Sequence, residues 1–310
     1  MATKKLSDTR VVLTSTVVSV FDVSLNALVA IITGSTVMLS QALQGLSDMM
    51  TGIVLFVGVK KSKRRPDAQY QFGYGREVFF WALIAGIIMF GGTGLASVYF
   101  GYQQFIRPEP VDNVWLAFIM LAFGFCTNAY AFSLSFRRLR QDGGRAGWLR
   151  RLRRSSLIET KATFLLDSIG TTATGIGIIA LLLFALTGDS RLDGAGGIAI
   201  GMMMMCAAML LILDIRSLII GRGAGAATSQ RIIDAAEGVT DVRSVLDLRT
   251  MYLGSDKLLV ILEVHLEDEL DTDMIEELID TIKCSVTRAV PSVHSIQVEV
   301  ETPEDELSDL

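Results

Sequence analysis

The sequence predicts an α-helical membrane protein with six transmembrane helices, followed by a C-terminal cytoplasmic α+β domain. Three observations predict this class. Of the 310 residues, 51% are hydrophobic and only 20% are charged, which is typical of a chain with several membrane spans. Six apolar stretches are long enough for the roughly 20 residues that a helical crossing needs. After Arg222 the hydropathy falls and acidic residues accumulate, which marks a domain boundary.

Each apolar stretch is expected to form one helix, so residues 1–222 form a six-helix transmembrane domain with both ends on the same side. The first stretch is too long for a secretory signal and has no small-residue cleavage site, so we expect it to remain as a span. The expected helices are Val11–Thr33, Val37–Val59, Val78–Phe105, Val114–Phe136, Ser156–Leu186 and Gly194–Ile220.

Lysine and arginine orient these helices, because they are retained on the cytoplasmic side of a membrane. They gather at the N-terminus and in the loops after the second and fourth stretches, whereas the other turns hold only Arg107 and Arg191. Both termini are therefore expected in the cytoplasm. The predicted location is the inner or plasma membrane of a prokaryote, with the lipid bilayer as the surrounding partner.

Residues 223–310 are expected to form the cytoplasmic domain. From residue 225 onward there are 20 acidic and 6 basic residues, so this surface would repel nucleic acid. Apolar residues alternate where strands are expected and recur on one helical face elsewhere, giving the order αββαβ, which is ferredoxin-like in outline. The expected elements are the helix Ser229–Gly238, the strands Val242–Met251 and Leu258–Leu266, the helix Thr272–Val290 and the strand His294–Val300.

Two aspartates inside apolar stretches are the main indication of function. Each follows a neutral polar residue by four positions, as Gln44 with Asp48 and Thr163 with Asp167, so each pair lies on one helix face. A carboxylate at mid-bilayer costs roughly 2.5–3.5 kcal/mol on insertion scales, and such residues usually serve ion or proton traffic. Asp193, near the start of the sixth stretch, is expected to be structural and near the membrane surface.

Several segments in order along the chain carry the signatures of one known family. These segments are Gly34–Asp48, Arg65–Asp67, Phe72–Glu77, Arg107–Pro110, Val245–Thr250 and Leu253–Leu259. In them the whole chain resembles the cation diffusion facilitators, which export divalent metals in exchange for protons. The resemblance implies six helices, a homodimer, and a tetrahedral metal site in which the second and fifth helices each give two ligands four residues apart.

At this implied metal site, the two aspartates match the family and their partners do not. Gln44 and Thr163 stand where stronger ligands are usual, so the set Asp48, Asp167, Gln44 and Thr163 offers only oxygen atoms. Oxygen ligands suit manganese or magnesium, whereas imidazole suits zinc, copper, iron and nickel. The resemblance favours a transition metal and the ligands favour a harder ion, so zinc, iron, manganese, cobalt and magnesium all stay open.

Further polar residues are candidates for the ion path or for a second metal site. Asp22, Asn26 and Asn128 are interpreted either as part of the cation or proton path or as structural groups. In the tail, a regulatory metal site is one hypothesis and ordinary surface residues are the alternative. The residues of that hypothetical site are His265, Glu263, Cys284 and His294. Tyr70 and Tyr74 replace the histidines of zinc-type relatives, so no accessory site is expected in the loop after the second helix.

The resemblance therefore implies a divalent cation efflux transporter, with the cation as substrate, protons as counter-ion and a homodimer as the working form. One alternative is a weakly transporting or non-transporting scaffold, or a heteromeric partner of a paralogue, because both ligand pairs have changed. A passive channel is less favoured because no continuous polar stripe follows the helices. No nucleophile and base pair is evident, so no enzyme activity is expected.

Overall fold

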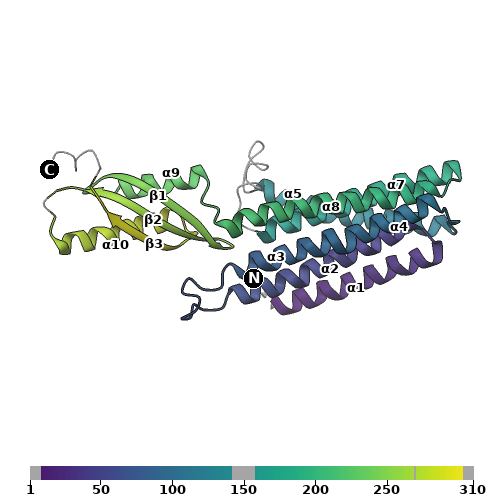
Figure 1. Ribbon diagram of the computed structural model, residues 1–310, viewed down its shortest axis with the longest axis horizontal. Coiled ribbons are helices and arrows are strands. Elements are labelled where there is room, and N and C mark those ends of the chain that lie inside the picture. The colour runs from purple at the N-terminus through teal and green to yellow at the C-terminus, as the bar shows by residue number, and fades with distance from the viewer. Residues whose placement is uncertain (1–7, 142–157, 269, 303–310) are drawn as a thin grey trace, which may run out of the picture. The chain divides into compact units, whose positions relative to one another are not determined.

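The computed structural model describes residues 8–141, 158–268 and 270–302, which form two compact units (Figure 1). The first unit groups Met1–Lys60 with Phe80–Ile215, and the second groups Lys61–Phe79 with Arg216–Leu310. The loop Lys61–Phe79 thus belongs with the tail, whereas the division expected at residue 222 leaves it with the membrane part. The first two residues predicted for the fifth helix, 156 and 157, lie outside the described residues.

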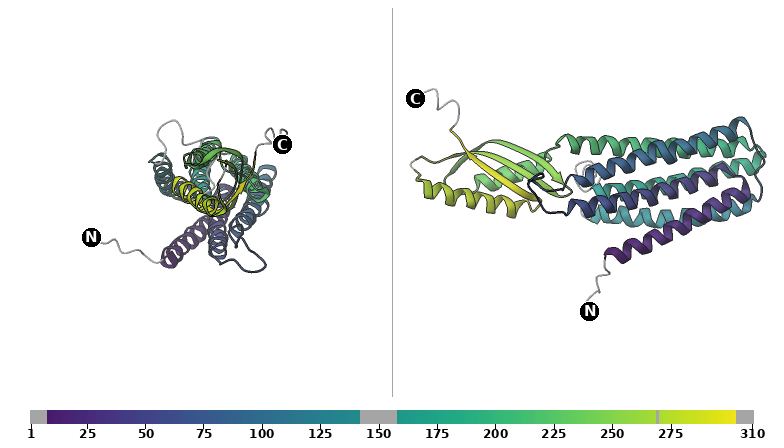
Figure 2. Two further views of the ribbon diagram at one scale, coloured as in Figure 1. Left: turned by 90° about the vertical axis from the view of Figure 1, so that its left-hand side faces the viewer. Right: turned by 60° about the horizontal axis from the view of Figure 1, so that its bottom comes forward.

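The first unit is a set of long helices that run side by side (Figure 2). Five spans in the described chain are long and apolar enough to cross a membrane, and Ser19–Thr33 adds a shorter apolar helix. This confirms the predicted helical membrane class. The helices are α1 (Asp8–Thr33), α2 (Thr36–Ser62), α3 (Glu77–Ile87), η1 (Ile88–Gly94), α4 (Leu95–Ile106), α5 (Val114–Gln141), α7 (Ile158–Thr187) and α8 (Arg191–Ile220).

The third span is one crossing made of three segments, because the π-helical segment η1 joins α3 to α4. The sequence predicts an uninterrupted helix here, since a π-turn leaves no mark on the apolar pattern. Just beyond η1, α4 packs closely on α8 through glycines. A Cβ on Gly101 would lie 2.6 Å from the backbone nitrogen of Ile198, and one on Gly201 would lie 2.7 Å from that of Val98. Such close backbone approach is how small residues stabilise helix pairs in membranes.

Replacing Gly201 by alanine should therefore force α4 and α8 apart. Overpacking of this kind costs about 1–3 kcal/mol, so we expect a lower thermal unfolding midpoint in detergent. Gly91→Ala is the matched control, because a Cβ there would meet nothing within 4 Å. Equal midpoints for the two variants would contradict this packing.

The tail domain, residues 216–302 of the second unit, has the predicted αββαβ order. Its sheet has the strand order β1-β2-β3, with β1 antiparallel and β3 parallel to β2. Alternate residues of β2, such as Leu258 and Leu262, are fully buried. They lie on one face of the sheet, the face on which the apolar sides of the helices pack. The elements are α9 (Ala226–Glu237), β1 (Val242–Gly254), β2 (Lys257–Leu266), α10 (Thr272–Ala289) and β3 (Val293–Val300).

Candidate functional site

A cavity of about 400 Å³ lies inside the first unit, between α1, α2 and α5. Most of its polar lining comes from these three helices, and α7 contributes Thr174. Its polar residues include all three predicted ion-path residues. The polar residues that line it are Ser19, Asp22, Asn26, Gln41, Gln44, Asp48, Thr127, Asn128 and Thr174.

The α2 wall of this cavity carries unpaired polar atoms. Gln41 and Gln44 are only 7% and 4% exposed, and with Asp48 they recur every three or four residues on one face. Gln44 Nε2 donates a weak hydrogen bond of 3.5 Å to Asp48 Oδ2. Gln41 Nε2, Gln44 Oε1 and Asp48 Oδ1 are buried without a hydrogen-bond partner among the described residues. Buried polar atoms are nearly always paired, so this face is suited to a polar ligand.

Glycines let the other walls approach α2. A Cβ on Gly45 would lie 3.6 Å from Asp22 Oδ2, so the α1 carboxylate sits against α2 beside Asp48. A Cβ on Gly170 of α7 would lie 3.0 Å from Asn128 Oδ1 and 3.2 Å from Gln44 Nε2. The amides of Asn128 and Gln44 therefore meet over Gly170. Asn26 instead donates its side-chain N–H to its own helix, at the backbone oxygen of Asp22 (2.9 Å).

Asp167 lies near the cavity without lining it. Its Oδ2 accepts a hydrogen bond from the hydroxyl of Ser135 on α5. The fourth residue of the predicted set, Thr163, is part of α7, but its side chain lies outside the described residues. Sequence reasoning missed Ser135, because nothing in its local pattern marks it as a partner of an aspartate 32 positions away.

A second buried polar cluster holds the start of α2. Asp193 lies in the first turn of α8, at the helix end where exposure was expected, but it is fully buried. Its carboxylate accepts hydrogen bonds from the hydroxyls of Ser35 (2.5 Å) and Thr36 (2.5 Å). It also accepts from the backbone N–H groups of Thr36 (2.6 Å) and Val37 (3.3 Å). An anion is favourable at a helix N-terminus, so Asp193 fixes the start of the helix that carries Asp48.

The four candidate metal ligands of the tail are spread over the domain. His265 and Glu263 share one side of β2, since they are two residues apart, and Glu263 pairs with Arg249 at 3.5 Å. His294 is at the start of β3, where the neighbouring Val293 pairs with Leu258 near the opposite end of β2. Cys284 is on α10, which covers the other face. The described residues contain no cluster of three or more metal-ligating side chains.

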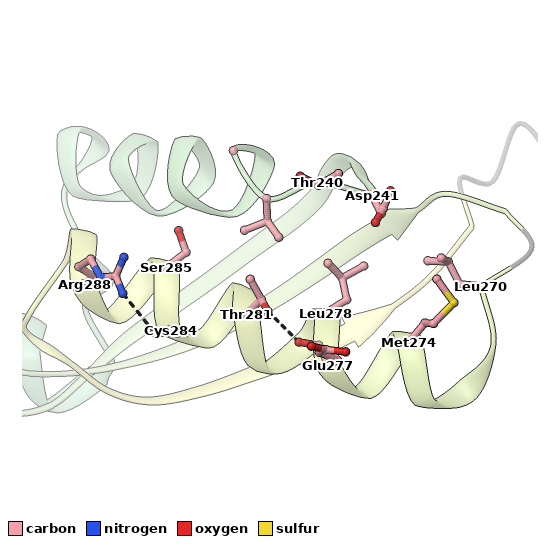
Figure 3. Close-up of a pocket in the computed structure, with 12 residues that line it drawn as sticks. Thr240, Asp241, Leu270, Met274, Glu277, Leu278, Thr281, Cys284, Ser285 and Arg288 are labelled. Atoms are coloured by element: carbon pink, nitrogen blue, oxygen red, sulfur yellow. Dashed lines mark hydrogen bonds between the residues drawn. The ribbon is translucent and has the colours of Figure 1, made fainter.

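A hollow of about 540 Å³ in the tail lies between α10 and the turn after α9 (Figure 3). Within it Arg288 Nη2 is 3.8 Å from the sulfur of Cys284, and Thr281 donates to the backbone oxygen of Glu277 (2.9 Å). These contacts are between neighbouring turns of one helix. They give the hollow no converging set of ligands.

The loop after α2 is folded around Asp67. Its carboxylate accepts hydrogen bonds from the hydroxyl of Tyr74 (2.6 Å) and from the backbone N–H of Tyr70 (2.8 Å). The bond from Tyr74, followed by that from Tyr70, holds the pKa of the Asp67 carboxyl below its ordinary value. The Arg64 guanidinium lies 4.8 Å from the centre of the Tyr74 ring. Both tyrosines thus have structural partners in this loop.

Acid should loosen this loop. Because folding lowers the pKa of Asp67, its stabilisation is complete above the unfolded-state pKa and is lost as the pH falls through the lower folded-state pKa. We expect the hydrogen-exchange protection factors of Tyr70 and Gly73 to fall in that acid range. Asp67→Asn should remove the pH dependence. An unchanged acid profile in Asp67→Asn would show that another group controls the loop.

Comparisons with known proteins agree on one family. The model of the family described as "Cation efflux transmembrane domain" matches residues 12–220. The human "Proton-coupled zinc antiporter SLC30A9, mitochondrial" is 24% identical, covering 87% of this chain and 54% of the relative. The "Magnetosome protein MamM" of Paramagnetospirillum magneticum is 22% identical, covering 90% of this chain and 84% of the relative. This chain therefore spans about half the length of the human relative.

The tail also matches solved structures. The isolated C-terminal domain of a MamM variant in its nickel form is 26% identical to this chain. The match covers 26% of this chain and all of that one, with a TM-score of 0.25.

Another relative matches most of this chain by sequence. It is the "Cation-efflux pump FieF" of Cronobacter sakazakii, which is 23% identical, with the match covering 79% of this chain and 75% of the relative.

Proposed function

Because this chain belongs to the cation efflux family, we propose that it exports a divalent cation from the cytoplasm across the membrane that it spans. The family is one of transporters rather than enzymes. The observation that carries the proposal is the cavity between α1, α2 and α5. There the buried Asp48 Oδ1 and Gln44 Oε1 have no hydrogen-bond partner within the part of the chain that the structure describes. A bound cation would be the positively charged partner that these two oxygen atoms lack.

In the proposed mechanism, a cation from the cytoplasm binds at Asp48 and Gln44, and protons release it on the other side. Asp167 is the second carboxylate that takes part in this proposed exchange. Neighbouring carboxylates repel each other, so a proton is held readily until a cation displaces it. Proton coupling is also named for the human relative, which supports the same exchange here. The working form that we propose is a homodimer in which the tails of the two copies contact each other.

The test is cation flux in proteoliposomes under a pH gradient. Zinc, iron, manganese, cobalt and magnesium should each be offered to wild type and to Asp48→Ala plus Asp167→Ala. We expect wild type to move at least one of these cations at a rate that depends on the gradient, and the double variant to move none. Equal flux in both would sink the proposal.

A scaffold remains the second candidate, because Gln44 replaces a stronger ligand. The two are separated by binding measured on the purified protein. A chain that assembles with its partners but binds none of the five cations at millimolar concentration is a scaffold rather than a transporter.

A further inference from the structure

The walls of the cavity suggest which residues complete the cation site. Resting on the proposed function, we propose that Asp22 of α1 and Asn128 of α5 join Asp48 and Gln44 as cation ligands. The resulting site draws its oxygen atoms from three helices and takes a hard divalent cation, of the manganese or magnesium class, in preference to Zn²⁺. It differs from the site that the sequence predicts, in which α2 and α7 supply all the ligands.

The position of Asp22 is the first observation that supports this site. It lines the same cavity as Asp48, and its Oδ2 lies against the α2 backbone at Gly45, three residues before Asp48. Two carboxylates that face one cavity repel each other, and a divalent cation between them balances both charges.

The position of Asn128 is the second observation that supports it. Its Oδ1 and the Gln44 amide converge over Gly170, where the missing side chain leaves room for both. Gln44 is 4% exposed and its Oε1 is unpaired. Asn128 and Gln44 line the same cavity as Asp22 and Asp48, so their amide groups complement the two carboxylates there. By contrast, the Asp167 carboxylate is bonded to Ser135 and does not line the cavity.

The chemistry of this set decides the class of cation. Two carboxylates and two amide oxygens, without an imidazole or a thiolate among the lining residues, suit manganese, magnesium or calcium better than zinc. Octahedral ions of this class retain water ligands. The cavity of about 400 Å³ has room for them, since one water occupies roughly 30 Å³.

The test is titration of purified full-length protein with Mn²⁺ and with Zn²⁺ by calorimetry, alongside flux of the same ions. We expect wild type to bind Mn²⁺ more tightly than Zn²⁺. Asp22→Asn should weaken Mn²⁺ binding by roughly tenfold or more, since even outer-shell changes at metal sites cost 10–100-fold. The matched control is Asp112→Asn, which removes a carboxylate from an exposed loop of the same unit and should bind as wild type does.

The outcomes separate the two proposals. If Asp48→Asn stops flux while Asp22→Asn and Asn128→Ala both bind Mn²⁺ as wild type does, the three-helix site is wrong and the transport function stands. Tighter binding of Zn²⁺ than of Mn²⁺ by wild type overturns the assignment of cation class. Wild type that neither binds nor moves a cation overturns both proposals. Asn128→Ala also keeps the test decisive if Asp22→Asn fails to fold.

Discussion

Asp48→Asn is expected to lower the binding affinity for the cation by at least roughly 100-fold, the loss of about 2.7 kcal/mol of binding free energy or more, and cation flux should fall with it. Asparagine keeps the size of the side chain and removes its charge. Asp48 lines the cavity together with the α1 carboxylate of Asp22. Losing it leaves a buried dication with too little compensating charge, which is costly.

The same measurement on Asp167→Asn tests the geometry. Asp167 is bonded to Ser135 and lies outside the cavity lining, so we expect a smaller loss of binding affinity than in Asp48→Asn. A larger loss in Asp167→Asn would place the cation nearer α7. Asp112→Asn again serves as the control, and both variants should elute as the wild-type oligomer before their flux is compared.

The second large effect is expected at Asp193. Asp193→Ala removes the common acceptor of four hydrogen bonds at the start of α2. Hydrogen bonds to charged groups contribute about 1.5–3 kcal/mol each, and donors left buried without a partner add a penalty. We therefore expect the free energy of unfolding to fall by about 3 kcal/mol or more, with a lower thermal midpoint and lower yield.

Asp189→Ala is the matched control for Asp193→Ala. Asp189 is exposed just before α8 and accepts a hydrogen bond from the backbone N–H of Arg191 (3.0 Å). Its loss should cost about 1 kcal/mol, as for an ordinary helix cap. A thermal midpoint for Asp193→Ala equal to that for Asp189→Ala would mean that the start of α2 is held by other contacts.

Local patterns explain why so much of the fold was predictable. The tail strand predicted at Leu258–Leu266 is observed as Lys257–Leu266, because its alternation of buried residues is written directly in the sequence. The apolar lengths of the membrane helices likewise predicted the spans. The π-segment Ile88–Gly94 was not predictable, since its residues are as apolar as those of an α-helix.

Within the site, the sequence predicted what lies on one helix and missed what crosses between helices. The spacing of Gln44 and Asp48 placed both on one face, and both line the cavity. Packing decided the rest. Asp193 accepts a hydrogen bond from the start of a helix that lies 157 positions earlier in the chain. Asp167 accepts one from Ser135. No local spacing encodes such partners, because they depend on which helices become neighbours.

The central claim is that a divalent cation binds at Asp48 in the cavity between α1, α2 and α5. Its most direct test is an experimental structure of the full chain with Mn²⁺, located by its anomalous scattering. The account predicts a peak about 2.0–2.6 Å from a carboxylate oxygen of Asp48, with Asp22 as a second ligand, and no such peak in Asp48→Asn. A Mn²⁺ peak found only in the tail, or at Asp167 away from Asp48, would contradict it.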